Sequence, residues 1–390
     1  MFSNQPSLAW FSISSIKAIL PLKEPTLNDL DPAYSALSKL LDSLPQGYPA
    51  TESGSELKLL KKLFTAEEAR TALALTLKPE TSSVIADRAG LDEAAVRAGL
   101  KSMVKKGLIE FEKTAGGIGF KLMPFVVGFY ERQVDRMDEE FAFLFDEFYR
   151  EGLARVMTMK PSAHRVIPVE KAIPIDIEVM PYERASACVD AAKAWGVLDC
   201  ICRLQRKLVG HPCGHSLENC LALSPRENAF AQAPSIRALT RDEAMKVLRD
   251  AESEGLVHTT ANSQEGISYI CNCCSCSCGF LRAAKELGVA DPVARSHFLC
   301  VCDEGSCAGC GACIDACQFG ALSLSKDGRC VVDAARCFGC GLCIASCPSE
   351  ALALARKGGA ELEPPPITEH DWAIARAINR GALKEYEGLK

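Results

Sequence analysis

A cysteine pattern occurs twice near the C-terminal end of the chain. The segment CAGCGACIDACQFGALSL begins at Cys307, and the segment CFGCGLCIASCPSEALAL begins at Cys337. Each copy has the spacing C-x2-C-x2-C-x3-C and continues through a turn to Ala-Leu. Because each short interval turns its sulfur toward one centre, the first three cysteines of a copy can surround one iron–sulfur cubane. The repeat therefore predicts two cluster sites.

The fourth cysteine of each copy leads toward a different site from the first three. It lies three residues further on and is expected to lead into a helix, which carries its sulfur away toward the other cluster, so the two copies exchange ligands. The two predicted ligand sets are Cys307, Cys310, Cys313 and Cys347 for one cluster, and Cys337, Cys340, Cys343 and Cys317 for the other. Glycines between these cysteines are expected to let the backbone approach the inorganic sulfides and donate N–H bonds to them. They are Gly309, Gly311, Gly339 and Gly341.

Over roughly residues 296–356 the chain resembles the bacterial-type ferredoxins that carry two [4Fe–4S] clusters. This resemblance implies a dicluster ferredoxin domain that transfers single electrons, usually at low potential. The first copy departs from the family pattern, because Gln318 stands where the family has proline. Proline is not a ligand, so we expect the cluster to form with a looser turn. Zinc binding by these cysteines is the less favoured alternative, because zinc sites use paired CxxC knuckles.

Three further cysteines lie close to the repeat but outside its spacing. Cys300, Cys302 and Cys330 occur in the apolar segments FLCVC and RCVV, which predict strands. We expect these thiols to pack as small buried hydrophobic groups.

The middle of the chain contains a second concentration of sulfur. Its nine cysteines are Cys200, Cys202, Cys213, Cys220, Cys271, Cys273, Cys274, Cys276 and Cys278. Disulfides are rare in a reducing compartment, so we predict one or two further iron–sulfur clusters here, with a zinc site or free thiols as the alternative. The neighbouring His211 and His215 are possible ligands or hydrogen-bond partners. Arg203 could raise the potential of a nearby cluster or form an ordinary surface salt bridge.

The spacing of the last five cysteines suggests how the nine are shared. In an extended backbone, alternate side chains point to opposite sides. Cys274, Cys276 and Cys278 would then face one side, and Cys271 and Cys273 the other. This alternation predicts two clusters flanking residues 271–278, completed by the cysteines of residues 200–220.

Composition limits the class of protein. The chain has 390 residues, of which 21 are cysteine, and its net charge of −6 gives no general reason to bind nucleic acid or an anionic membrane. No run of 18 apolar residues occurs, which predicts that no segment spans a membrane. The start of the sequence has no basic region before its apolar stretch and no twin-arginine pair. We therefore expect a cytoplasmic protein whose clustered cysteines bind metal.

Residues 57–125 show a different pattern. Helical periodicity in SSVIADRAGL and DEAAVRAGLKSMVKKGLIEF is followed by a strand, a glycine turn at Gly116–Gly117 and a second strand. This order resembles the winged-helix fold, with Asp92 or Glu93 opening the recognition helix. Residues 55–125 contain twelve basic and nine acidic residues, a net charge of +3. Nucleic-acid domains usually carry a larger excess, so docking to a partner or a second chain is favoured over DNA binding.

The remaining segments predict helical scaffold. Thr240 and Glu243 form a capping box for a helix that ends before Gly255. Residues 181–196 are expected to form another helix, with Cys188 packed inside it. An aromatic, acidic helix over residues 135–157 is expected in the core or at a subunit contact, and residues 371–386 predict a docking helix.

These observations predict an α+β multidomain protein. Its expected parts are an N-terminal extension (1–54), a winged-helix-like domain (55–130), a connecting helix (131–160), a helical cysteine-rich domain (161–294), a dicluster ferredoxin domain (295–357), and a linker with a C-terminal helix (358–390). No dinucleotide-binding or phosphate-binding glycine motif and no catalytic triad occur.

We therefore predict an iron–sulfur electron carrier of anaerobic or redox-active metabolism. It would relay single electrons between a soluble donor and a partner oxidoreductase, as a homodimer or as a subunit of a complex. Two alternatives follow in order: an oxidoreductase with a catalytic cluster in the middle domain, and a redox-sensing regulator that binds DNA through the winged helix.

Overall fold

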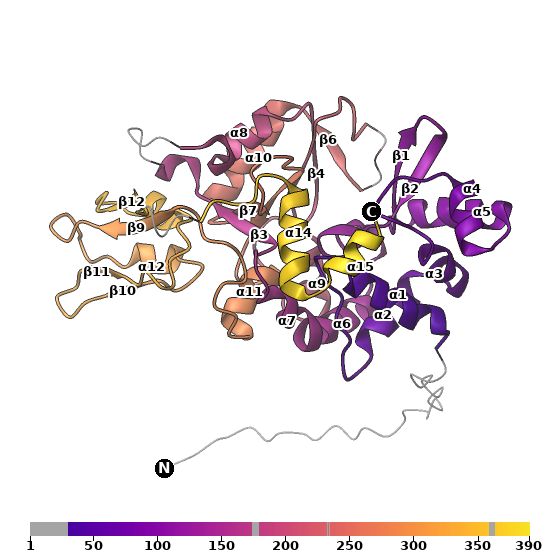
Figure 1. The fold of residues 1–390 in the computed structure, drawn as a ribbon. Coiled ribbons are helices and arrows are strands. Elements are labelled where there is room, and N and C mark those ends of the chain that lie inside the picture. The colour runs from indigo at the N-terminus through magenta and orange to yellow at the C-terminus, as the bar shows by residue number, and fades with distance from the viewer. Residues whose placement is uncertain (1–29, 174–178, 232, 234, 359–362) are drawn as a thin grey trace, which may run out of the picture.

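The computed structural model describes residues 30–173, 179–231, 233, 235–358 and 363–390 (Figure 1). The export-signal and N-terminal predictions that concern residues 1–29 lie outside these ranges. Helices and strands are both abundant, in agreement with the predicted α+β class. In the part of the chain that is described, no helix combines the length and the apolar character needed to cross a bilayer.

The N-terminal region is a helical body with one aromatic core. Its helices are α1 (Pro32–Asp42), α2 (Ser55–Leu63), α3 (Ala66–Ala72), α6 (Glu139–Phe148) and α7 (Ala154–Met157). Their buried side chains form one cluster that includes Tyr48, Phe125, Phe145 and Phe148. Because α1 belongs to this cluster, residues 32–54 pack as part of the helical body. The acidic helix α6 buries its aromatic face here, which is the core role expected for it.

Residues 80–121 contain the elements expected for the winged-helix-like segment, in the expected order. They are α4 (Ser82–Ala89), α5 (Glu93–Lys105), and the antiparallel strands β1 (Glu110–Thr114) and β2 (Gly117–Lys121). Asp92 caps α5 by accepting a hydrogen bond from the Ala95 N–H. On the exposed face of α5, Arg97 pairs with Glu93 one turn earlier, at 2.5 Å. The winged-helix interpretation and its DNA contact stay predictions.

The middle region is built on a six-stranded antiparallel sheet in the order β3-β7-β8-β5-β4-β6. Its strands are β3 (His164–Ile167), β4 (Ala194–Asp199), β5 (Glu218–Ser224), β6 (Arg237–Leu239), β7 (Val257–Ala261) and β8 (Tyr269–Cys273). The expectation of a helical middle domain was therefore wrong. Helices α8 (Ala185–Asp190), α9 (Ile201–Leu208), α10 (Arg241–Ser253) and α11 (Gly279–Glu286) accompany the sheet.

The helix expected over residues 181–196 shows why the prediction failed. Only α8 is an α-helix there, whereas residues 194–199 form β4, the strand between β5 and β6. Pairing on both edges overrides the helical preference of the alanine-rich sequence. Gly196 permits close packing, because a Cβ atom there would lie 2.4 Å from a side-chain carbon of Ile236. In contrast, α10 has the predicted Thr240–Glu243 capping box, and Cys188 is buried in the apolar core between α8 and the sheet.

The C-terminal cysteine repeat forms a small lobe at one end of the molecule (Figure 1). It consists of strands β9 (Phe298–Cys302), β10 (Leu322–Leu324), β11 (Cys330–Val332) and β12 (Leu352–Arg356), with short helices α12 (Ala312–Ala316) and α13 (Leu342–Ala345). Strand β9 pairs with β12, and β10 pairs with β11. Cys300, Cys302 and Cys330 therefore lie in strands, as predicted.

The last helices return to the N-terminal body. Helix α14 (Glu369–Arg380) lies across the molecule, and α15 (Leu383–Gly388) follows it (Figure 1). The indole of Trp372 donates a hydrogen bond to the Ser162 carbonyl, at 2.9 Å. The buried guanidinium of Arg376 donates to the carbonyls of Pro45, Met159 and Pro161, and to that of Val156. The predicted docking helix thus binds its own chain.

Candidate metal centres

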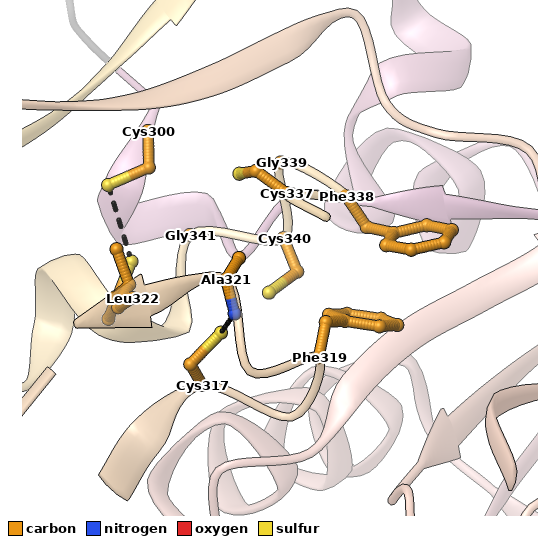
Figure 2. Close-up of a pocket in the computed structure, with 11 residues that line it drawn as sticks. Cys300, Cys317, Phe319, Ala321, Leu322, Cys337, Phe338, Gly339, Cys340 and Gly341 are labelled. Carbon is orange, nitrogen blue, oxygen red and sulfur yellow. Dashed lines mark hydrogen bonds between the residues drawn. The ribbon is translucent and has the colours of Figure 1, made fainter. Parts of the chain in front are cut away.

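One cavity of the C-terminal lobe collects a complete predicted ligand set (Figure 2). Its lining includes Cys317, Cys337, Cys340 and Cys343. Phe319 and Phe338 stack on each other beside the cavity, with ring centroids 4.2 Å apart. Burial is the main cause that raises the pKa of Cys340 and Cys337. Buried thiols become thiolates when a metal binds, which suits these residues to hold a cluster. We call this group the inner set.

A second cavity collects the other predicted set. It is lined by Cys307, Cys310, Cys313 and Cys347. Cys310 is exposed, whereas Cys307 and Cys313 are buried. We call this group the outer set. Each cavity contains three cysteines of one repeat and the fourth cysteine of the other, so the chain brings together the residues that the exchange of ligands requires.

The backbone of both repeats is shaped for close approach. Gly309 and Gly339 occupy equivalent positions, and both have a φ of +67°. A Cβ atom would lie 2.3 Å from the Gly328 carbonyl oxygen at the first position and 2.2 Å from the Phe298 carbonyl oxygen at the second. Each position therefore requires glycine, both for its conformation and for its packing.

Backbone N–H groups also point at the cysteine sulfurs. The Ala321 N–H donates to Cys317 Sγ at 3.3 Å (Figure 2), and the Cys330 N–H donates to Cys307 Sγ at 3.4 Å. Hydrogen bonds to ligand sulfurs help to set the reduction potential of a cluster.

Cys300 and Cys330 are buried as expected, but they also line the two cavities. Cys300 Sγ lies 3.6 Å from Cys343 Sγ at the inner set, and Cys330 Sγ lies 3.7 Å from Cys313 Sγ at the outer set. Sequence spacing gave no indication of this position. It places one additional thiol beside each four-cysteine set.

Six of the nine middle-region cysteines form a closed group. The pKa of each thiol is shifted by two neighbouring thiols of the group, which gives the ring order Cys200, Cys202, Cys278, Cys273, Cys271 and Cys220. Cys200, Cys273 and Cys278 are buried, and the other three are half-buried. We call this group the six-cysteine ring.

The sheet and two helices position the ring. Leu221 and Ile270 face the apolar core beside α10, so their strand neighbours Cys220 and Cys271 face the opposite side of the sheet. Cys200 and Cys278 are the N-cap residues of α9 and α11. The positive ends of two helix dipoles therefore lie at the ring, where they favour negative charge.

The ring thiols differ in acidity because they share protons. Hydrogen bonds from Cys202 and Cys220 lower the pKa of Cys200, whereas the bonds with Cys200 raise the pKa of both partners. Hydrogen bonds from Cys271 and Cys278 lower the pKa of Cys273 to about 6. Six adjacent thiolates would repel one another, so full ionisation requires a cationic core. The ring is suited to hold such a core.

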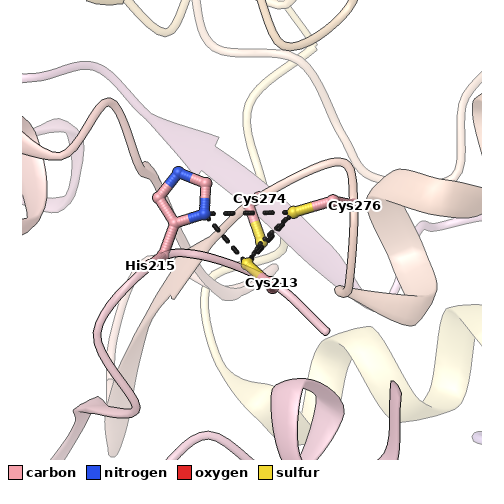
Figure 3. Close-up of side chains that lie close together, drawn as sticks. All are labelled: Cys213, His215, Cys274 and Cys276. Atoms are coloured by element: carbon pink, nitrogen blue, oxygen red, sulfur yellow. Dashed lines mark hydrogen bonds between the residues drawn. The ribbon is translucent and has the colours of Figure 1, made fainter. Parts of the chain in front are cut away.

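The three remaining cysteines meet a histidine in a separate group (Figure 3). The group consists of Cys213, His215, Cys274 and Cys276, and its donor atoms all lie within 4.8 Å of one another. We call it the Cys3His set. His211 is not part of this set.

This division differs from the predicted sharing at one residue. Cys273 belongs to the ring and Cys274 to the Cys3His set, as the predicted alternation required. Cys278, however, lies in the ring with Cys271 and Cys273. Strand β8 ends at Cys273, and the chain then turns, with the Cys278 N–H donating to the Cys274 carbonyl at 3.0 Å. Side chains point alternately to opposite sides only in an extended backbone, so the predicted alternation does not apply beyond Cys273.

Arg203 lies between the ring and the Cys3His set. Its side chain is 3% exposed and donates to the carbonyls of Asn272 and Ser216 and to Cys274 Sγ, at 2.9, 3.0 and 3.7 Å. Burial opposes its charge, but neighbouring thiolates, chiefly Cys200, raise the pKa of the guanidinium. Among the described residues no carboxylate forms an ion pair with Arg203. Of the two roles considered for Arg203, the ordinary surface salt bridge is therefore contradicted by the structure.

Gln318 joins the C-terminal lobe to the middle region. Its side-chain oxygen accepts hydrogen bonds from the N–H and hydroxyl of Ser275, at 3.0 and 2.8 Å. Its amide donates to the Gly255 carbonyl at 3.0 Å. The residue that departs from the ferredoxin pattern thus makes a specific contact with the turn that carries Cys274 and Cys276.

Comparison with known proteins identifies the C-terminal lobe. Residues 306–351 match the 4Fe-4S dicluster domain. The match covers both cysteine repeats, so the chain contains an iron–sulfur domain that binds [4Fe–4S] clusters and supports electron transfer. No curated protein and no solved structure shows significant similarity to the chain.

Proposed function

We propose that this protein is an electron relay in which the dicluster domain exchanges single electrons with a further iron–sulfur centre held by the six-cysteine ring. The inner and outer sets would hold one [4Fe–4S] cluster each. Bound clusters supply one-electron redox chemistry, and the chain supplies ligands, insulation and hydrogen bonds that adjust their potentials. A partner oxidoreductase and a soluble donor would be the two ends of the relay.

The observation that carries the proposal is a shared apolar core. Cys273 and Cys278 of the ring lie in the same buried cluster as Cys340 of the inner set, together with Leu281 and Phe338. The Val169 N–H also donates to the Cys340 carbonyl at 2.9 Å. The inner set and the ring are therefore embedded in one continuous low-dielectric region, which is the arrangement a relay between two buried centres requires.

Exposure distinguishes the outer set from the inner set. The outer set contains exposed Cys310, whereas Cys337, Cys340 and Cys343 of the inner set are buried. The outer set is therefore the end of the relay that lies nearer the surface. A redox partner would approach the outer set, and Phe319 and Phe338 would keep water from the inner set.

Burial of the ring favours relay over catalysis. Cys200, Cys273 and Cys278 are 9%, 7% and 6% exposed and the other three ring cysteines are half-buried, which leaves limited surface for a substrate to reach. Six thiols also exceed the four that a cubane needs, so the ring can saturate its metals without an open position. An electron can reach such a buried centre through packed protein, whereas a substrate molecule requires an open channel.

Anaerobic iron and sulfide analysis combined with EPR tests the first part of the proposal. Two cubanes supply about eight irons per chain, so a relay with an occupied ring contains more than about eight. A Cys273→Ser variant should lose the excess iron and keep the dicluster signals. An iron content of about eight in the wild-type chain would show that the ring is empty and would overturn the relay.

Electron transfer into the ring tests the second part. A reduced protein donor, too large to reach the ring, should reduce the ring centre of the wild-type chain, as followed by freeze-quench EPR. Cys340→Ser, which removes a ligand of the inner set, should slow or stop this reduction. Cys300→Ser is the matched control in the same cavity and should leave it unchanged. Equal reduction rates in all three chains would contradict a path through the inner set.

A further inference from the structure

The Cys3His set is geometrically different from the three cluster sets. Cys213 Sγ lies 3.6 Å from Cys274 Sγ and 3.2 Å from Cys276 Sγ, and the Cys274 and Cys276 sulfurs are 3.1 Å apart. His215 Nδ1 lies 2.9 Å from Cys213 Sγ and 3.9 Å from Cys276 Sγ (Figure 3). Four donors thus surround one small volume.

These distances fit a single ion. A tetrahedral zinc site has Zn–S bonds of about 2.3 Å, which places its sulfurs roughly 3.8 Å apart. A cubane separates its ligand sulfurs further, because each sulfur binds a different iron at a different corner. The Cys3His set is too compact for a cubane, and it requires only a small expansion to enclose a zinc ion.

The donor chemistry and the charge agree with this geometry. Three thiolates and one imidazole form one of the ordinary structural zinc sites. Zinc with three thiolates carries a net charge of −1, and the buried Arg203 guanidinium lies 3.7 Å from Cys274 Sγ with no carboxylate partner among the described residues. The cation therefore neutralises the site, which reduces the cost of burying it.

We propose that Cys213, His215, Cys274 and Cys276 bind one zinc ion in a tetrahedral structural site, separate from the iron–sulfur centres. Zinc has no redox chemistry, so the site takes no part in electron transfer and the inference stands independently of the relay. Its ligands join the loop that contains residues 213–215 to the turn over residues 274–277. Ser275 in that turn donates two hydrogen bonds to the side-chain oxygen of Gln318, so the ion would hold the turn in the position that the dicluster domain binds.

Metal analysis of the whole chain, purified without oxygen, tests the site. Zinc should be present at about one ion per chain. His215→Ala should lose most of this zinc while iron content and cluster EPR signals stay at wild-type values. His211→Ala is the matched control, because His211 is an exposed histidine of the same segment that is not part of the set, and it should retain the zinc.

Cobalt substitution gives a readout of geometry. Growth with Co²⁺ in place of zinc should produce the ligand-field and thiolate charge-transfer absorption of a tetrahedral cobalt site, in wild type and His211→Ala but not in His215→Ala. Zinc-free wild-type protein would overturn the proposal. The proposal would also be overturned if His215→Ala lost iron and kept its zinc content, because the Cys3His set would then be an iron site. Either result leaves the relay to be judged by the iron and EPR measurements above.

Discussion

The dicluster domain and the middle region both concentrate cysteines, but they assemble their sites in opposite ways. In the dicluster domain, two consecutive repeats supply all eight predicted ligands, and the same spacing occurs in each. In the middle region, strands β5 and β8 contribute three cysteines, the N-terminal ends of α9 and α11 contribute three more, and a loop and a turn contribute the remaining three. The first arrangement depends on local spacing, and the second depends on the tertiary fold.

This difference has a consequence for stability. Ligands that follow one another can surround a cluster as soon as the local chain closes around it. The six-cysteine ring instead requires β5, β8, α9 and α11 to be in place first. We therefore expect the dicluster domain to keep its clusters when the middle region is damaged, and the ring to respond to changes in either helix or strand.

The largest expected effect comes from removing a ligand of the inner set. Cys340→Ser should abolish one cubane, with a loss of about four irons per chain, because a thiolate that binds iron is replaced by a hydroxyl. Iron analysis and EPR of the reduced protein measure this loss. The control is Cys300→Ser, in the same cavity but outside the repeat, and it should keep its iron. Equal losses in the two variants would make Cys300 a ligand.

A smaller loss of iron is expected from the ring. Cys273→Ser should remove the ring centre and leave about eight irons in the dicluster domain. Cys188→Ser changes a buried cysteine that packs in the apolar core beside the sheet and belongs to none of the four cysteine sets, so its iron content should match wild type. If Cys273→Ser also lost the dicluster clusters, the two regions would not assemble independently, and the comparison would fail.

The same comparison explains what the sequence could predict. The spacing of the two repeats was sufficient to assign their eight cysteines to two cavities, because the dicluster pattern places three cysteines of one copy with the fourth cysteine of the other. The assignment of Cys278 failed because it assumed an extended chain beyond Cys273. His215 could be considered from its position two residues after Cys213, but nothing local indicated that Cys274 and Cys276 would approach it from a distant turn.

The fold was predictable to a similar degree. Capping residues predicted α10, whose start depends on a hydrogen bond between Thr240 and Glu243 within four residues. The middle sheet was missed because β4 depends on partners more than twenty residues away in the sequence, including Leu221 of β5. The strand or helix preference of a local segment does not indicate which distant segment it pairs with.

A contact between the two regions provides a third test. Gln318→Ala removes three hydrogen bonds to Ser275 and Gly255, and should lower the free energy of unfolding by about 1–3 kcal/mol. Denaturant titration of the protein with its clusters measures this change. EPR should also detect an altered environment at the inner set, because Gln318 follows Cys317.

Gln264→Ala is the control for this variant. It loses one side-chain hydrogen bond, to the Pro365 carbonyl, away from the metal sites. It should leave the EPR spectrum unchanged.

The smallest effect concerns the sheet that supports the ring. His164 in β3 is 3% exposed, stacks on Phe280 and lies 3.0 Å from the Tyr269 hydroxyl. Burial lowers the pKa of His164 to about 3. His164 binds a proton near pH 6.5 in the unfolded chain, whereas buried His164 in the folded chain does not. The contribution of His164 to the free energy of unfolding is therefore complete above pH 6.5. It falls by about 1.4 kcal/mol per pH unit as the pH decreases toward 3.

Urea titrations at pH 7.5 and pH 5.5 measure this dependence. The wild-type chain should lose about 1.4 kcal/mol more than His164→Gln between these two values, because glutamine does not titrate. His370, an exposed histidine at the start of α14, offers the control variant His370→Gln, which should behave as wild type. If His164→Gln showed the same pH dependence as wild type, His164 would bind a proton as readily in the folded chain as in the unfolded chain. The sheet would then tolerate a charge beside Phe280, and burial would not set the protonation state of His164.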